Sequence, residues 1–219
     1  MLSVNNFGEA GTYINADYGG RWASNVVNVV EQYVRTAGYD TQVTVVGGGD
    51  FEVGKDLEPG WNGPQRTLDW ADGYGRATSL PFYNYGDAAG CPLASSEMAD
   101  NSLGCQNGWG QRELLQLSRR DVYNRQAVPQ IYTHNGVQAQ QWYHISRFGA
   151  AGLGPIPFAG VLTTFGACQL PLVDRDERCP FIDNLSAEGW LQLYDALKQD
   201  LRTPYEPPYS TDIKYSFQP

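Results

Sequence analysis

Four carboxylates lie within nine positions of the acidic segment 43–61, after a β-branched run and three glycines. Residues two positions apart in an extended chain share a face, and the strand rise places their Cβ atoms roughly 6.6 Å apart. Asp56 and Glu58 form one such pair, and Asp50 and Glu52 form another. Enzymes that hydrolyse glycosidic bonds use two carboxyl groups about 5 to 9.5 Å apart. The spacing therefore favours acid–base cleavage of a glycan, with Asp56 and Glu58 as the catalytic pair.

The two carboxyl groups have different expected roles. We expect Glu58 to be the general acid, because an aromatic-lined site and a neighbouring carboxylate both raise the pKa of a carboxyl group. Asp56 would orient water or stabilise an oxocarbenium-like transition state. Two other interpretations of residues 50–58 stay open. They are a calcium site, since Ca²⁺ prefers oxygen ligands, and a solvated loop.

Aromatic and imidazole side chains at the expected strand ends and in the adjacent loops are the candidate substrate-binding residues. Flat aromatic faces suit the apolar faces of sugar rings, and Tyr83 and Tyr132 are expected to hydrogen-bond near the reacting carbon. Tyrosines of this kind also fit core packing with a satisfied hydroxyl, and His134 fits a loop position before the turn residues Asn135 and Gly136. The candidates are Trp61, Tyr83, Tyr85, Trp109, Tyr132 and His134.

Composition narrows the class of protein. A length of 219 residues fits a single domain, 1–219, with an extended tail at 203–219. The net charge of −9 argues against nucleic-acid binding, which needs a basic surface, and no apolar run approaches the ~20 residues of a membrane span. Two histidines ten residues apart do not make a zinc site, and neither a phosphate-binding loop nor a dinucleotide motif is present. We therefore expect no cofactor and no metal, and a carbohydrate as the partner.

The four cysteines form two local pairs, Cys91 with Cys105 and Cys168 with Cys179. Their spacing differs from that of zinc motifs, and an even number of cysteines in loops predicts disulfides. Closing a loop of about fifteen residues contributes roughly 3 kcal/mol. Disulfides indicate an oxidising compartment and a secreted protein. Because no basic and apolar leader is seen at the start, we expect that a secretion signal has been removed or that the sequence is a fragment.

Hydrophobic periodicity predicts strands and helices that alternate along the chain. Such alternation is typical of parallel strands joined by helices. The segment 113–118 is expected to be a strand, with a helix as the alternative, and 86–110 is expected to be a long loop. The expected strands are 11–16, 42–46, 80–85, 113–118, 128–132 and 158–165, and the expected helices are 21–36, about ten residues from Pro64, 136–147 and 186–201.

Three segments resemble a known family. They are Asp-Leu-Glu-Pro-Gly-Trp at 56–61, Phe-Tyr-Asn-Tyr-Gly at 82–86, and Val-Pro-Gln-Ile-Tyr at 128–132 with Gln141 and Trp142. Together they are similar to bacterial secreted glycoside-hydrolase-like (β/α) barrels of the muramidase type, which carry a D-x-E motif at a strand end. The resemblance implies a TIM-type α/β barrel with its site at the carboxyl ends of the strands.

The chain is short for a complete barrel of this kind. Eight strand–helix units take about 250 residues, whereas six strands are expected here. We therefore expect an incomplete or N-terminally truncated barrel, open at 11–16 and at 158–165. An apolar edge invites pairing, so the strand 158–165 should be covered by the tail, by residues 1–10, by a missing N-terminal segment or by a partner chain. An alternative function is then a non-catalytic carbohydrate-binding or structural secreted protein on a degenerate barrel.

Overall fold

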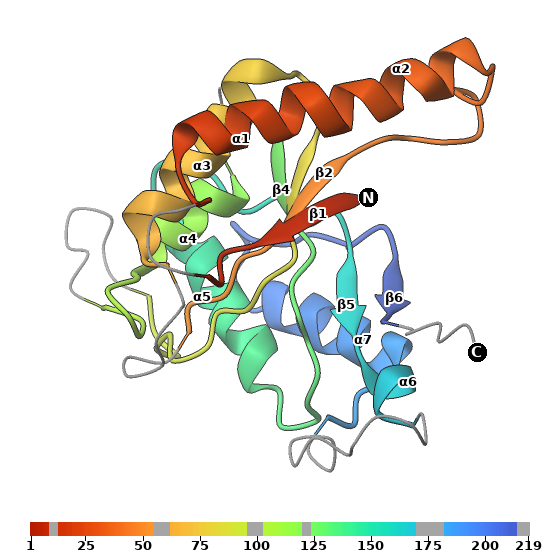
Figure 1. Ribbon diagram of the computed structural model, residues 1–219. Coiled ribbons are helices and arrows are strands. Elements are labelled where there is room, and N and C mark those ends of the chain that lie inside the picture. The colour runs from red at the N-terminus through yellow and green to blue at the C-terminus, as the bar shows by residue number, and fades with distance from the viewer. Residues whose placement is uncertain (9–12, 55–61, 96–102, 120–123, 170–181, 214–219) are drawn as a thin grey trace.

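The computed structural model describes residues 1–8, 13–54, 62–95, 103–119, 124–169 and 182–213 (Figure 1). Four strands form a parallel sheet in the order β1-β2-β3-β4, and β5 pairs in parallel with β6. The strands are β1 (Leu2–Asn5), β2 (Gly47–Asp50), β3 (Phe82–Asn84), β4 (Arg125–Ala127), β5 (Val161–Thr163) and β6 (Ser210–Asp212).

Helices join the consecutive strands, as parallel pairing requires. The first connection is one continuous helix whose middle turn, η1, is π-helical. The helices are α1 (Ala16–Trp22), η1 (Ala23–Val27), α2 (Asn28–Thr36), α3 (Pro64–Ala77), α4 (Gln111–Ser118), α5 (Val137–Ala150), α6 (Phe165–Cys168) and α7 (Ser186–Leu197). The chain therefore has the α/β architecture with parallel strands that its sequence pattern predicts.

Two isolated bridges join the four-stranded sheet, at its β4 edge, to the β5–β6 pair. Parallel bridges pair Ala127 with Phe158 and Gln130 with Leu162. The six strands therefore lie side by side in chain order. No ladder between β6 and β1 is found in the described parts of the chain. The tail supplies β6, which pairs with β5, so of the alternatives expected to cover the strand within 158–165 the structure shows the tail.

The amino-terminal strand lies earlier than expected. The pattern predicts a strand at 11–16, but Ala16 already begins α1, and residues 9–12 lie outside the described parts. The Asn15 side chain accepts a hydrogen bond from the Tyr18 amide at 3.1 Å and so caps this helix. The first strand is instead β1, and β1 forms this edge of the sheet.

The second strand consists largely of the three glycines that resemble a turn. The expected strand 42–46 is wrong, because β2 begins at Gly47. A Cβ atom at Gly47 would lie 2.5 Å from the Tyr74 hydroxyl oxygen on α3 and 2.6 Å from ring atoms of the same side chain. A residue without a side chain lets α3 pack directly on this strand. Ladders to β1 and β3 on either side hold the glycines extended.

The other expected elements divide into confirmed and corrected ones. The segment 113–118 is not a strand but most of α4, because its leucines at 114, 115 and 117 are all buried against the core. The expected strand 128–132 begins too late, since β4 precedes it. The helix that starts at Pro64 and the helices predicted at 136–147 and 186–201 are confirmed, although the last ends at Leu197. The strands at 80–85 and 158–165 contain β3 and β5.

The loop after β3 is held by a disulfide and by side chains of the following helices. Cys91 and Cys105 are bonded, as predicted, with their Cα atoms 4.0 Å apart. Gln141 Nε2 on α5 donates to the Cys91 carbonyl at 3.0 Å. The second predicted pair includes Cys179, which lies outside the described residues, and none of the described cysteines is a free thiol. Within the described residues, no helix is long and apolar enough to cross a membrane.

Candidate functional site

The strands present two different faces. Side chains at alternate positions, such as Leu2, Phe82 and Val161, pack into the main core with the helices. The intervening residues form the other face. On this face Asp50, at the end of β2, accepts a hydrogen bond at 2.8 Å from Gln130, which follows β4. Strands two apart in a flat sheet are separated by roughly 10 Å, so this contact indicates that the sheet curves toward the second face.

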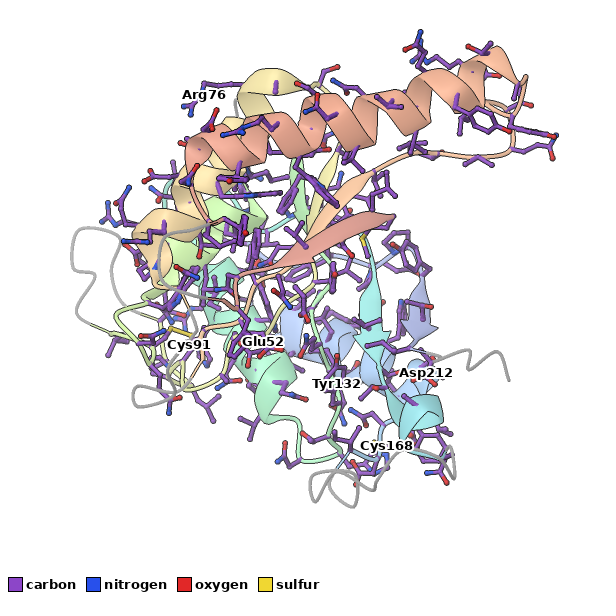
Figure 2. All side chains as sticks on the ribbon, in the orientation of Figure 1. Glu52, Arg76, Cys91, Tyr132, Cys168 and Asp212 are labelled. Carbon is purple, nitrogen blue, oxygen red and sulfur yellow. A yellow bond between two sulfur atoms is a disulfide. The ribbon has the colours of Figure 1, made fainter. Side chains whose placement is uncertain are left out.

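We call this second surface the concave face. It consists of Ser3, Asn5, Gly48, Asp50, Tyr83, Tyr85, Gln126, Val128, Gln130, Gly160, Leu162, Tyr209 and Thr211. Three apolar residues, Val128, Ala159 and Leu162, pack there with Tyr83, Tyr85, Tyr132 and Ile213. In Figure 2, Glu52 and Tyr132 lie on the side of the molecule to which the arrows of β5 and β6 point in Figure 1. The carboxyl ends of several strands therefore meet at one side.

A cavity of about 500 Å³ opens at the carboxyl ends of β1 and β2. Asp50 lines this cavity, and four of the other lining residues are aromatic. Phe7 and Tyr13 are 53% and 64% exposed, so they form an open rim. The lining residues are Ser3, Val4, Asn5, Phe7, Tyr13, Ile14, Asp50, Trp70 and Tyr85. The cavity thus combines one carboxyl group with aromatic surfaces.

The environment of Asp50 favours its protonated form. Burial is the main cause, and the nearby Asp87 carboxylate adds to it, while the hydrogen bond from Gln130 acts in the opposite direction. Together they raise the pKa of Asp50 to about 6. Burial also raises the pKa of Asp87, whose carboxylate accepts a hydrogen bond from the Val53 amide at 3.0 Å. Asp50 therefore exchanges its proton in the range in which acid–base catalysis near neutral pH takes place.

Hydrogen bonds of Tyr85 and of Asn6 hold the segments around the cavity. Tyr85 hydrogen-bonds to Ser3, and burial is the main cause that raises the pKa of its phenol. Asn6 is fully buried behind β1, and its side-chain amide donates to the Glu52 carbonyl at 2.9 Å and accepts from the Glu52 amide at 3.0 Å. The same amide group donates to the Asn62 carbonyl at 3.1 Å, just before α3. Asn6 thus ties the ends of β1 and β2 to the start of α3.

The residues named from the sequence lie in different places. Asp56, Glu58 and Trp61 lie outside the described residues. Tyr83 and Tyr85 lie on the concave face, and Tyr132 packs against the apolar residues there. Trp109 is buried in the main core. The sequence alone did not single out Gln130 or Asp87, although each is a polar residue just after a strand, which is where sites of parallel sheets lie.

His134 lies in the loop after β4 and joins it to the start of α7. Its Nε2 atom lies 2.9 Å from a carboxylate oxygen of Glu188, and its Nδ1 atom lies 3.0 Å from one of Asp183. The hydrogen bond to Glu188 is the main cause that raises the pKa of His134. Backbone amides of Asp183 and Asn184 also donate to the Tyr132 carbonyl at 3.0 Å. His134 therefore positions the segment that carries Tyr132.

The raised pKa of Asp50 has a consequence for stability. In the folded state this carboxyl group holds its proton up to about pH 6, compared with an ordinary 3.8, so its stabilising contribution is complete below pH 3.8 and is lost as the pH rises through 6. At 1.36 kcal/mol per pKa unit, the loss amounts to at most about 3 kcal/mol. Asp50→Asn keeps the oxygen that accepts from Gln130 and has no charge. Relative to the wild type, D50N should therefore gain up to about 3 kcal/mol in unfolding free energy between pH 3.5 and pH 7.

Urea unfolding at several pH values measures this gain. Asp69→Asn is the matched control, because Asp69 lies on the exposed side of α3, where it accepts a hydrogen bond from Gln65. Its unfolding free energy at pH 7 should lie within about 0.5 kcal/mol of that of the wild type, as expected for a surface substitution. A D50N curve parallel to that of the wild type from pH 3.5 to pH 7 would contradict the shifted pKa.

No group of three or more His, Cys, Asp or Glu residues that could hold a metal ion occurs among the described residues. The calcium interpretation of 50–58 depends in part on residues 55–58, which lie outside them. Comparison of the chain with protein-family models, with curated proteins and with solved structures found no match.

Proposed function

We propose that the protein is an extracellular glycoside-hydrolase-like domain that cleaves the glycan of a polysaccharide or of peptidoglycan. One observation carries the proposal: Asp50, whose carboxyl group has a pKa of about 6, is a lining residue of an aromatic-rimmed cavity at the carboxyl ends of parallel strands. Parallel α/β folds carry their sites at this end of the strands. We further propose that the six strands belong to an open (β/α) barrel of the muramidase type. The Cys91–Cys105 disulfide is compatible with an extracellular location.

In the proposed mechanism Asp50 is the general acid. A carboxyl group that stays protonated up to about pH 6 can give its proton to the leaving glycosidic oxygen as the bond breaks. Gln130 fixes one oxygen of the carboxyl group. Asp56 and Glu58 are six and eight residues further along the chain, and one of them would act as the base or nucleophile that the reaction also requires. This differs from the sequence-based assignment, in which Glu58 is the acid.

Release of reducing sugar from a panel of polysaccharides and from peptidoglycan tests the proposal. D50N should lower kcat/KM by about 100-fold or more, since general acids contribute 10²–10⁴-fold. Wild-type kcat/KM should fall above about pH 6, because Asp50 then loses its proton. Glu58→Gln and Asp56→Asn identify the second carboxylate, and Asp69→Asn should match the wild type. If no substrate is cleaved, or if D50N is as active as the wild type, the proposal is wrong.

A second function from another class is favoured by one feature of the concave face. Hydrolysis requires two carboxyl groups, and among the described residues of this face only Asp50 carries one. A non-catalytic carbohydrate-binding protein would need no carboxyl group as a proton donor. Binding of wild-type protein on a glycan array, together with no turnover of the bound glycans, would support this alternative over hydrolysis.

A further inference from the structure

Tyr209, just before β6, lies beside Gly160, which comes just before the paired strand β5. A Cβ atom at Gly160 would lie 2.5, 2.7 and 2.9 Å from three adjacent atoms of the Tyr209 ring. Three such similar distances arise when the atom approaches the face of the ring, because an approach at the edge would leave two of the atoms much farther away. One face of the ring therefore rests on bare backbone. The residue is nevertheless 44% exposed, so part of its surface faces solvent.

This ring belongs to the same surface as the Asp50 cavity. Tyr209 and Tyr83 lie close enough to interact electrostatically, and burial is the main cause that raises the pKa of each. Tyr83 and Tyr85 pack against the same apolar residues of the concave face, and Tyr85 lines the cavity. Tyr85, Tyr83 and Tyr209 thus lie on the same face of the strands as Asp50.

The polar residues of the concave face are almost all uncharged. Amides and hydroxyls accompany the tyrosines, and the described residues of this face include no lysine, arginine or histidine. Uronate or sulfate groups of an anionic polysaccharide would need cationic partners. The net charge of −9 disfavours such polymers further. The neutral residues are Ser3, Asn5, Gln126, Gln130 and Thr211.

We propose that Tyr209, supported by Gly160, is a stacking platform for a sugar ring, and that the substrate is an uncharged polysaccharide of hexoses with equatorial substituents. Such rings present flat apolar faces of C–H groups, which match an exposed aromatic face, and their hydroxyls pair with neutral amides. The substrate class rests on the proposed function. Tyr209 is then a residue that selects and positions the substrate, while Asp50 supplies the chemistry.

Binding measured apart from turnover tests the platform. Affinity electrophoresis of D50N would use hydroxyethylcellulose and glycol chitin as neutral probes and polygalacturonate as the anionic probe. We expect retardation by a neutral probe and none by polygalacturonate. Adding Tyr209→Ala should weaken the binding at least about tenfold, as expected for the loss of one buried aromatic contact. Tyr209→Phe should preserve binding, because stacking needs the ring and not the hydroxyl.

Tyr33→Ala is the matched control, since Tyr33 is 67% exposed on α2 and should leave binding unchanged. Thermal unfolding of each variant checks that it is folded. If Tyr209→Ala binds the neutral probes as tightly as its parent, or if polygalacturonate is preferred, the inference is overturned even where the wild type cleaves a polysaccharide. If Tyr209→Ala abolishes binding of a neutral probe and the wild type cleaves no substrate of the polysaccharide panel, the platform stands and the proposed hydrolysis fails.

Discussion

Gly73→Ala should destabilise the protein by about 3 kcal/mol or more, at the upper end of the range for overpacking. A Cβ atom at Gly73 on α3 would lie 1.9 Å from the carbonyl oxygen of Ala16 and 2.6 Å from its carbonyl carbon on α1. The two helices are equally close at a second point, because a Cβ atom at Gly19 on α1 would lie 2.0 Å from the Trp70 carbonyl oxygen on α3. Backbone atoms cannot rotate away as a side chain can. The substitution therefore forces the two helices apart.

The cost is large because α3 cannot move without disturbing the core. Trp70 on this helix lies 5.5 Å from Phe51 and 5.9 Å from Phe82 between ring centroids. Separation of α3 from α1 would pull this aromatic group off the sheet. Urea unfolding at 25 °C measures the loss, and a lower midpoint with an unchanged slope is the expected form.

Gly20→Ala is the matched control for this prediction. Gly20 lies on α1 next to Gly19, but the nearest atom to an added Cβ is the Gly73 carbonyl oxygen at 3.5 Å, an ordinary contact. Alanine is a better helix former than glycine, so Gly20→Ala should be neutral or should stabilise by up to about 1 kcal/mol. Equal unfolding midpoints for the two variants would contradict the close backbone contact of α1 with α3.

Asp72→Ala should cost about 3–5 kcal/mol, the range for breaking a buried ion pair. The side chain of Arg125 on β4 is fully buried, and its Nη2 atom lies 2.7 Å from a carboxylate oxygen of Asp72 on α3. Arg125 Nη1 also donates to the Gln116 carbonyl of α4 at 3.2 Å. The arginine thus links the sheet to two of its covering helices. Without Asp72 it would keep its charge in a buried position with less compensation.

A second variant separates the charge effect from a loss of packing. Arg125→Met in the Asp72→Ala background removes the uncompensated charge and keeps an unbranched side chain, so it should recover part of the lost stability. Asp69→Ala is the control on the same helix and should change the unfolding free energy by no more than about 0.5 kcal/mol. If Asp72→Ala and Asp69→Ala have the same urea unfolding midpoint, the ion pair does not hold β4 to α3.

The local sequence pattern was sufficient to predict the elements in which apolar residues recur at regular spacing. The helices α3, α5 and α7 follow from apolar residues at helical spacing, and Pro64 marks the start of α3 because its missing amide donor costs nothing at a first turn. The Cys91–Cys105 pairing follows from the short loop between the two cysteines. Alternation of these helices with apolar segments was enough to indicate parallel strands.

Elements that depend on distant neighbours could not be predicted in this way. Gly47, Gly48 and Gly49 have the composition of a turn, and only the close contact of Tyr74 and the ladders on both sides make them a central strand. The strand β1 has no apolar run of its own and is extended because it pairs with β2. The leucines of α4 fit either type of element until the core decides which of them are buried.

Some features of the candidate site could likewise be predicted from the sequence, and others could not. The sequence by itself determined that carboxylates follow the three glycines and that aromatic residues lie in and just after the third strand, since both are short-range patterns. Only the tertiary structure decided which carboxyl group is perturbed, because the hydrogen bond from Gln130 to Asp50 joins residues 80 positions apart. The pKa of Asp50 depends on burial and on Asp87, and both arise when the strands assemble. The ring of Tyr209 likewise meets Gly160 only because the tail pairs with β5.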